Sequence, residues 1–281
     1  MTLYLVKLGG SRITLPGEEK RVDGTSLRDL CCQIGKWWEK VEGDSLIVVH
    51  GAGSFGHKEA KRIGIRGGDR EGRPIEKKDL PGIALIHREV RELHLRVLKD
   101  LHEVGVPAYS HPPYPFVSWQ GSPGAGRRAD ITSLKLLQSA RWGLVPVTFG
   151  DVVEDPSLRY SVISGDHLIC FSAMEGCRAG ERVKVIFVMS ERGIREGERY
   201  LREIKPRVAR ELLGRLGRGV SSRGEEDVTG GISLKLKVGI KLAEAGVEVV
   251  YTDGREGSLY EELKGRSSRA SRIIKEVKGE R

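Results

Sequence analysis

Aromatic residues and long apolar segments are both scarce in this sequence. Phe, Trp and Tyr make up 6% of the 281 residues, and basic clusters interleaved with aromatic side chains, on which unpaired bases stack, are absent. No apolar segment reaches the length needed to cross a membrane. The net charge is +9, but basic and acidic residues are interspersed. We therefore expect a highly charged surface and anionic ligands, with no nucleic-acid partner and no membrane contact.

Signatures of metal sites and hydrolytic sites are absent as well. Neither pair of cysteines, Cys31 with Cys32 or Cys170 with Cys177, has the usual spacing of a zinc site. The sequence contains no Ser-His-Asp signature and no His-x-x-x-His pair. It also begins without the basic and apolar regions of a signal peptide. The simplest interpretation is a cytoplasmic protein whose thiols are structural.

Short apolar segments alternate with amphipathic ones along the chain. Near-continuous apolar runs are typical of strands buried on both faces of a parallel sheet, which predicts an α/β fold with a mostly parallel central sheet. The predicted strands are Leu3–Leu8, Leu46–Val49, Val106–Tyr109, Leu144–Phe149, Tyr160–Ile163, Val183–Met189 and Val247–Tyr251. The predicted helices are Ser26–Val41, Lys58–Ile63, Pro81–Val104, Asp130–Trp142, Asp166–Ala173, Pro206–Leu216 and Ile232–Ala245.

Two glycine-rich segments lie between these elements. Gly64–Lys78 is strongly charged, which favours a mobile loop or lid. Gly217–Gly224 is interpreted as a disordered link. No internal repeat and no domain boundary is visible. On the long helix, the histidines are too far apart to form a local ligand pair, and we interpret them as solvated or capping residues: His87, His94 and His102.

Three glycine turns occur at the ends of predicted elements: Gly9–Ser11, Gly51–Gly56 and Thr229–Gly231. Unpaired backbone N–H groups converge at such turns, and glycine allows a ligand to approach the backbone. A basic residue accompanies each turn, and these residues are Lys7, His57 and Lys235. Several turns with nearby positive charge predict a site for a polyphosphate.

The central turn matches G-x-G-x-x-G at Gly51, Gly53 and Gly56. A dinucleotide site would need a second strand that ends in an acidic residue about 20 positions later. A charged loop occupies that span, which argues against a nicotinamide or flavin cofactor. The residues after Gly56 also lack the Gly-Lys-Ser/Thr order of a P-loop.

Several polar residues next to these turns have two interpretations. His57 is either a helix-capping residue or a donor to a phosphate oxygen. Asp166 is either an N-cap or a carboxylate that orients lysines or magnesium. Asp151 and Asp227, each at the end of an element, leave the same choice open.

Five motifs in order resemble the amino acid kinase superfamily, and within it most closely the isopentenyl phosphate kinase family. They are Lys7-Leu-Gly-Gly-Ser11, His50-Gly-Ala-Gly-Ser-Phe-Gly-His57, Gly150-Asp-Val-Val153, Ser164-Gly-Asp166 and Asp227-Val-Thr-Gly-Gly-Ile-Ser-Leu-Lys235. The resemblance extends from about residue 3 to residue 264. The histidine that closes the second motif separates this family from relatives that phosphorylate amino acids, carbamate or UMP.

The resemblance implies an open αβα sandwich, formed by a single domain over residues 1–281. Residues 1–180, approximately, are expected to form an acceptor-binding half and residues 181–281 a nucleotide-binding half. The implied reaction transfers the γ-phosphate of ATP, with Mg²⁺, to isopentenyl phosphate, and relatives are commonly homodimers. A kinase for another small phosphate or phosphonate, or a non-catalytic nucleotide-binding protein of the same fold, are the alternatives.

The resemblance also implies roles for individual residues. The catalytic set would be Lys7, His57, Asp166 and Lys235, in which Asp166 organises the lysines. The ATP phosphates would contact Lys7, Leu8, Gly9, Gly10, Ser11, Gly53, Gly231 and Lys235. The acceptor would contact Ala52, His57 and Gly165. The attacking group is already a phosphate oxygen, so alignment and positive charge matter more than a general base.

Three positions depart from the family pattern. Leu15 and Pro16 stand where the family has an Asp-Lys pair, and Lys20 or Arg12 is the candidate to replace that lysine. Met189–Gly193 replaces a Thr-Asp-Val-Asp-Gly segment near the nucleotide. His167 replaces a second aspartate after the Ser-Gly-Asp motif.

Overall fold

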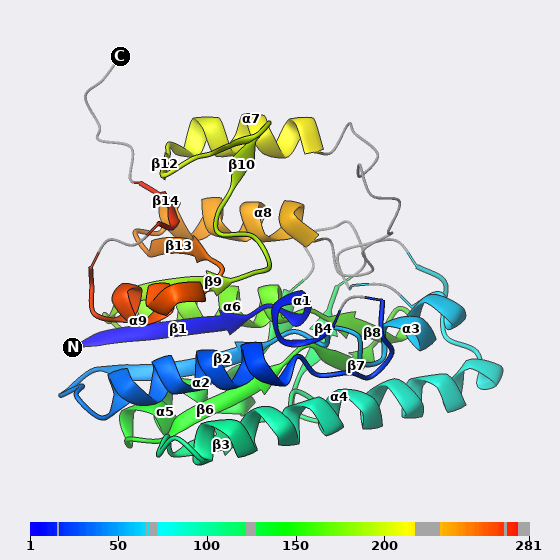
Figure 1. The fold of residues 1–281 in the computed structure, drawn as a ribbon. Coiled ribbons are helices and arrows are strands. Elements are labelled where there is room, and N and C mark those ends of the chain that lie inside the picture. The colour runs from blue at the N-terminus through cyan, green and yellow to red at the C-terminus, as the bar shows by residue number, and fades with distance from the viewer. Residues whose placement is uncertain are drawn as a thin grey trace.

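A large, mostly parallel sheet runs through the whole molecule (Figure 1). The computed structural model describes residues 1–15, 17–65, 67, 72–121, 128–216, 231–266 and 269–274. The strand order is β12-β14-β13-β9-β1-β2-β6-β3, and every pairing is parallel except that of β13 with β14. The predicted α/β class and mostly parallel sheet are therefore confirmed.

The elements follow the predicted alternation, with ends shifted by a few residues. The strands of the large sheet are β1 (Thr2–Leu8), β2 (Ser45–His50), β3 (Ala108–Ser110), β6 (Val145–Phe149), β9 (Arg182–Val188), β12 (Glu203–Ile204), β13 (Glu248–Thr252) and β14 (Ser271–Ile273). The helices are α1 (Gly10–Ile13), α2 (Gly24–Trp38), α3 (His57–Ile63), α4 (Leu80–His102), α5 (Leu136–Arg141), α6 (Gly165–Arg178), α7 (Pro206–Leu216), α8 (Gly231–Glu244) and α9 (Ser258–Leu263).

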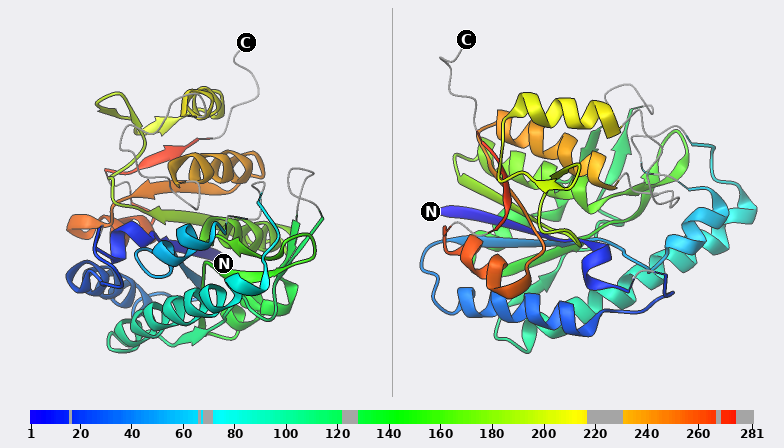
Figure 2. Two further views of the ribbon diagram at one scale, coloured as in Figure 1. Left: turned by 90° about the vertical axis from the view of Figure 1, so that its right-hand side faces the viewer. Right: turned by 45° about the horizontal axis from the view of Figure 1, so that its top comes forward.

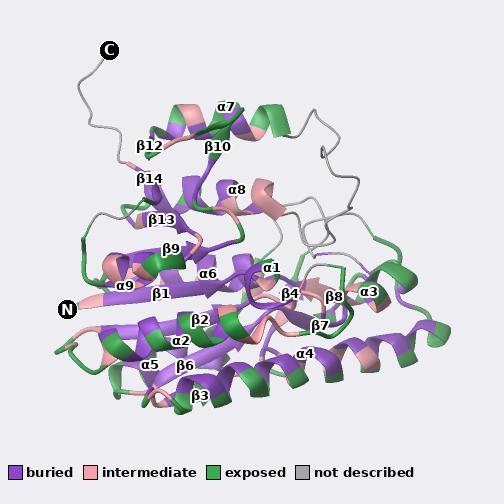
Figure 3. Cartoon of the chain, viewed as in Figure 1, coloured by how far each residue is buried: buried purple, intermediate pink, exposed green. Residues whose placement is uncertain are grey.

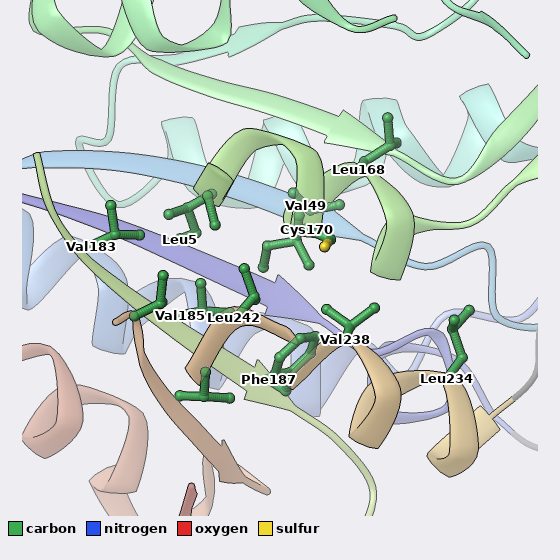
Figure 4. Packing of buried hydrophobic residues seen from close by; sticks show 14 of the residues in the cluster. Leu5, Val49, Leu168, Cys170, Val183, Val185, Phe187, Leu234, Val238 and Leu242 are labelled. Carbon is green, nitrogen blue, oxygen red and sulfur yellow. The ribbon is translucent and has the colours of Figure 1, made fainter. Parts of the chain in front are cut away.

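Side chains of the central strands alternate between two apolar layers, because successive residues of a strand point to opposite faces. Leu3 and Leu5 of β1 pack with α5, α6 and α8, and Figure 4 shows Leu5, Val49 and Phe187 in this layer. Val6 and Leu8 pack with α2, α4 and α9 on the other face. The resulting three layers confirm the αβα sandwich, and Figure 3 shows its central strands almost entirely buried.

A second, smaller sheet covers part of the edge at which the parallel strands end. Its order is β5-β4-β7-β8, formed by β4 (Ser118–Gln120), β5 (Arg128–Asp130), β7 (Asp151–Asp155) and β8 (Arg159–Ile163). A short hairpin follows β9, and its strands β10 (Arg195–Glu196) and β11 (Arg199–Tyr200) have two residues each. Of the second sheet, only β8 was predicted, because β4 and β5 have three residues each and β7 has charged residues at both ends of a two-residue apolar run.

The predicted helix Asp130–Trp142 is wrong over its first half. The Asp130 carboxylate accepts from the N–H of Thr132 at 2.9 Å, which closes a turn instead. Lys135 then has a left-handed backbone, with φ of 51°, so the helix begins only at Leu136. This local competition from an aspartate side chain explains why α5 is short.

Two further predictions concern segments that are described only in part or not at all. Gly64–Lys78 is described except for residues 66 and 68–71, and Lys77–Asp79 forms a short 3₁₀ turn before α4. The predicted link Gly217–Gly224 lies outside the described residues, as do Thr229 and Asp227. In the part of the chain that is described, no helix combines the length and apolar character needed to span a membrane.

The carboxyl ends of β1, β2 and β9 lie at one edge of the large sheet, with α1 and α3 beside them (Figures 1 and 2). In parallel α/β sheets, ligands bind at this edge, since the loops and helix N-termini that follow the strands converge there. The turns that follow β1 and β2 therefore meet at one place, which is the candidate site.

Candidate functional site

A buried carboxylate lies between two lysines at the carboxyl ends of the parallel strands. Asp166 Oδ1 is 3.2 Å from Lys7 Nζ, and Asp166 Oδ2 is 3.3 Å from Lys235 Nζ. Lys7 comes from β1, Asp166 from the first turn of α6 and Lys235 from α8. The structure thus brings together three of the four predicted catalytic residues from segments that are far apart in the chain.

The protonation of this cluster follows from its charges. Burial alone would raise the pKa of Asp166, but the ammonium groups of Lys235 and Lys7 outweigh burial and hold that pKa below its usual value. The carboxylate therefore stays ionised and keeps both lysines positioned. Two ammonium groups around one carboxylate leave an excess positive charge, which can be directed at an anionic ligand.

The N-cap interpretation of Asp166 is wrong. Ser164 caps α6, and its hydroxyl accepts from the N–H of His167 at 3.2 Å. Asp166 is left free to face the lysines. His167, which replaces an aspartate in the family pattern, contacts the ring of Trp119 edge-on at a centroid distance of 5.3 Å and forms part of the packing there.

The first two glycine turns interlock. A Cβ atom on Gly10 would lie 2.3 Å from the backbone nitrogen of Gly53, so this contact is possible only for glycine. Gly53 has φ of 55°, and a Cβ there would meet the hydroxyl of Thr14 at 2.3 Å. That hydroxyl donates to the carbonyl of Gly10 and accepts from the N–H of Ser54, and so links both turns.

Of the other predicted ligand-binding positions, Gly165 and Gly231 contact the lysines of this cluster. A Cβ on Gly165 would come within 3.1 Å of Lys7 Cε and of the His50 carbonyl. The Gly9 N–H donates to the carbonyl of Val188 at the end of β9, which joins the first turn to the 181–281 segment. Gly231 accepts from Lys235 through its carbonyl at 3.5 Å. Leu8 is buried at the end of β1, and Ser11 is exposed on α1.

His57 is the first residue of α3 and is half-buried. Within the described residues, its side chain has no hydrogen-bond or ion-pair partner, so it is available to a ligand. The residue before it, Gly56, has a left-handed backbone with φ of 74°. Its N–H donates to the buried carboxylate of Glu89 on α4 at 2.9 Å.

Lys20 lies at this turn, whereas Arg12 does not. Lys20 Nζ is 2.6 Å from Glu89 Oε1, the same carboxylate that accepts from Gly56. The side-chain hydrogen bond to Glu89 raises the pKa of Lys20. Arg12 is buried and donates from Nε to the Asp253 carbonyl at 2.8 Å, next to the end of β13. Of the two candidates for the missing family lysine, only Lys20 pairs with a residue that holds the Gly51–Gly56 turn, namely Glu89.

After β9, in the segment that departs from the family pattern, two side chains contact Tyr200 of the following hairpin. Glu191 accepts from the Tyr200 hydroxyl at 2.5 Å, and the Arg192 guanidinium lies 4.2 Å from the centre of the Tyr200 ring.

The Asp151 side chain is paired with α4, because Arg91 and His87 of that helix lie at 3.0 and 3.5 Å from its two oxygens. Asp151 therefore ties β7 to α4.

Sequence reasoning missed Glu89, Thr14 and the pairing of His50 with His94. A signal existed for Glu89, which lies three residues after Ile86 and next to Val90 on the apolar stripe of α4. A carboxylate on such a stripe needs a buried partner. His94, interpreted as solvated or capping, is in fact 3% exposed and hydrogen-bonded to His50. That interpretation was wrong.

A metal ion has few ligands here. The described residues include no group of three or more His, Cys, Asp and Glu side chains that could hold one. Asp166, the carboxylate interpreted as a possible magnesium ligand, has both oxygens directed at lysines. The described side chains therefore do not form a magnesium cage of their own. This agrees with the usual binding of Mg²⁺ through waters and substrate phosphates.

Comparison with known proteins gives a consistent result. Residues 2–252 match the model of the "Amino acid kinase family". The chain is 33% identical to the isopentenyl phosphate kinase of Methanothermobacter thermautotrophicus, across 96% of this chain and 98% of that protein. It is 28% identical to the isopentenyl phosphate kinase of Arabidopsis thaliana, across 87% and 85% of the two chains.

Solved structures agree with this likeness. An X-ray structure of an isopentenyl phosphate kinase is similar at a TM-score of 0.71 and 30% identity, and the match covers 97% of this chain and 100% of the other. A product complex of the Thermoplasma acidophilum isopentenyl phosphate kinase has a TM-score of 0.71 at 23% identity, with the same coverage. The second comparison supports the fold.

The buried histidines predict a loss of stability in acid. Burial lowers the pKa of His50 to about 4 and that of His94 to about 2, whereas the unfolded chain takes up protons near pH 6.5. Below pH 6.5 the unfolded state binds more protons, so the free energy of unfolding falls as pH falls. From pH 7 to pH 5 the pair contributes a loss of about 4 kcal/mol.

Urea unfolding at pH 7 and pH 5 measures this loss. The variant His94→Leu removes one of the two groups, and its loss between the two pH values is expected to be about half that of the wild type. An unchanged pH dependence in the variant would contradict the assignment of His94 as a buried neutral imidazole.

Proposed function

Because the chain belongs to the amino acid kinase family, we propose that it transfers the γ-phosphoryl group of ATP to isopentenyl phosphate, giving isopentenyl diphosphate and ADP. The observation that carries the proposal is the Asp166 carboxylate that holds Lys7 and Lys235 at the edge where the glycine turns meet. Isopentenyl phosphate kinases with up to 33% identity over nearly the whole chain support the choice of acceptor.

In the proposed reaction, a terminal oxygen of the acceptor phosphate attacks the γ-phosphorus. The bond to the oxygen that bridges the β- and γ-phosphorus breaks, and ADP leaves with that electron pair. The acceptor oxygen carries charge already, so no proton has to be removed. The task of the protein is to align two anions and offset their repulsion. Lys7 and Lys235 supply that charge, and Asp166 holds them in place before the substrates bind.

We assign the two substrates to different halves of the site. The ATP phosphates would lie along Gly9, Gly10, Ser11 and Gly53, with Gly231 and Lys235 from the 181–281 half. The acceptor phosphate would lie at Ala52, His57 and Gly165. Magnesium would enter with ATP, on its phosphate oxygens.

An apolar cluster lies beside the Gly51–Gly56 turn, which we call the acceptor turn. This cluster fits a hydrocarbon tail. Ile86 lies so close under the turn that a Cβ on Gly56 would come within 2.9 Å of its Cγ2 atom. Around it lie the buried side chains Ile83, Val90, Phe149 and Val152, with the partly buried Ala52, Tyr160 and Val162. At the partly buried members of this cluster, a charged amino acid head group would lose hydration, whereas an isopentenyl group would gain from burial.

We assign the role of the missing family lysine to Lys20. The loop that carries it contacts the acceptor turn through Arg21 and Ser54, and the following helix α3 through Glu19 and Lys58. Lys20 is 35% exposed in its side chain and is held by one carboxylate, so its ammonium group can reach a bound phosphate with little rearrangement.

We also propose a homodimer formed through the edge strand β3. Three exposed aromatic side chains, Tyr109, Phe116 and Trp142, are 55%, 54% and 73% exposed and line a groove of about 440 Å³ beside this strand. An open strand edge with an exposed apolar patch is a surface that proteins usually cover. A second copy provides the matching strand edge.

Turnover tests the proposed reaction directly. The purified protein with ATP is expected to convert isopentenyl phosphate to isopentenyl diphosphate, with a higher kcat/KM than for other small phosphates or phosphonates. His57→Ala should reduce kcat/KM about 100-fold or more, because a donor to the charged acceptor is lost, and should leave the Kd for ATP unchanged. His57→Gln, which keeps a donor, is the control. Normal turnover in His57→Ala removes His57 from the mechanism.

The role of Lys20 is tested with a matched pair of variants. Lys20→Met is expected to lower kcat about 10-fold to 100-fold, because one positive charge near the transferring group is lost. Lys58→Met removes an ammonium group that is 78% exposed and contacts the same loop through Glu19. It should retain wild-type kcat. Equal losses in both variants would mean that the loop, and not the Lys20 charge, is required.

Light scattering on a sizing column tests the dimer. The wild type is expected to have twice the mass of one chain, and Trp142→Glu should shift it to the monomer mass, since a buried charge in the interface is costly. Leu216→Glu, at an exposed leucine of α7 near the opposite edge of the sheet, is the control and should remain dimeric. A monomeric wild type contradicts the proposal.

A further inference from the structure

A buried chain of hydrogen bonds runs from the edge strand β3 to the acceptor turn. Ser110 of β3 is exposed, and its hydroxyl lies 2.8 Å from His94 Nε2. His94 Nδ1 lies 3.1 Å from His50 Nε2, and His50 Nδ1 lies 3.1 Å from the Gly51 carbonyl oxygen. His50 is completely buried and His94 is 3% exposed. The mechanism above uses neither histidine.

The last acceptor determines the direction of every bond in this chain. The Gly51 carbonyl can only accept, so His50 carries its proton on Nδ1. His50 Nε2 of a neutral ring then accepts, which requires His94 to donate from Nδ1. His94 Nε2 accepts in turn from the Ser110 hydroxyl. Both rings are therefore Nδ1–H tautomers, assigned here from the hydrogen-bond network.

Aromatic packing keeps the two rings in this geometry. His50 stacks on Phe149 at a centroid distance of 5.2 Å, and His94 lies 4.3 Å from the same ring. The Arg91 guanidinium lies 5.4 Å from the centre of the Phe149 ring. The rings therefore have little freedom to turn away from the Gly51 carbonyl.

Holding the Gly51 carbonyl also orients the next N–H. In a trans peptide, the C=O and N–H groups point in opposite directions. With the Gly51 oxygen held toward His50, the Ala52 N–H points away from the buried rings. Among the described residues, this N–H has no acceptor within the protein. A fixed N–H without a protein acceptor at a glycine turn is a donor for an anion.

We propose that His50 and His94 are positioning residues, which hold the Gly51–Ala52 peptide so that the Ala52 N–H donates to the acceptor phosphate. This inference rests on the proposed function for the identity of the acceptor. Neither ring touches the substrate. His94 orients His50, and His50 orients the peptide, so the acceptor contact depends on two side chains buried behind it.

Nitrogen NMR of histidine-labelled wild-type protein at pH 7 tests the hydrogen-bond chain without any substrate. Both rings are expected to show a protonated Nδ1 and an unprotonated Nε2, opposite to the tautomer that predominates for free histidine in water. His94→Leu assigns the His94 signals by their loss. An Nε2–H tautomer at His50 overturns the proposal.

Three variants on α4 test the effect on the acceptor. His94→Leu is expected to raise the KM for isopentenyl phosphate about 10-fold, as for a weakened charge-assisted hydrogen bond, and to leave the KM for ATP unchanged. His94→Gln restores a donor toward His50 Nε2 and is expected to recover most of that loss. His102→Leu removes a histidine that contacts the Ala108 carbonyl at 2.7 Å on the same helix and should have no effect.

The outcomes separate this inference from the proposed function. If the wild type turns over isopentenyl phosphate and His94→Leu shows an unchanged acceptor KM, the positioning role is wrong and the function stands. If His94→Leu raises both Michaelis constants equally, or His94→Gln gives no recovery, the histidine supports the fold only. If the wild type turns over no acceptor, the function fails, and the tautomers still decide the hydrogen-bond chain.

Discussion

The attraction of two lysines to one buried carboxylate is the interaction on which the site depends. Asp166 joins Lys7 of β1 to Lys235 of α8, and each group would be costly to bury alone. If either lysine moved away, one oxygen of the buried Asp166 carboxylate would lose its ion-pair partner. The three elements are therefore held in one arrangement. The positive charge that remains faces the turns where phosphates are expected, so the same interaction stabilises the site and prepares it for anions.

Close backbone packing positions the turns around this charge. Gly10 and Gly53 touch through their backbones, and Thr14 links both turns through one hydroxyl. The acceptor side is held from behind by α4, through Glu89 at the Gly56 N–H and through His94 at His50. Helix α4 thus supports this turn, and its buried apolar side chains pack directly beneath it.

Much of the fold was predictable because parallel strands buried on both faces leave long apolar runs in the sequence. The predictions failed where a single side chain competes with the local pattern. Asp130 closes a turn and Lys135 breaks the helix, so the predicted Asp130–Trp142 helix is cut short. His94 lies on the apolar stripe of α4, four residues after Val90 and three before Val97, so its burial was predictable, but its partners on β2 and β3 were not.

The sequence by itself determined the order of the motifs, the family and the residue types that can handle phosphate, since these depend on local spacing and composition. Only the tertiary structure decided which of these residues meet. It placed Lys20 rather than Arg12 near the Gly51–Gly56 turn, through Glu89, and left the His57 side chain without a partner among the described residues. Contacts between residues tens of positions apart arise from the packing of helices on the sheet. They cannot be predicted from the pattern of neighbouring residues in the sequence.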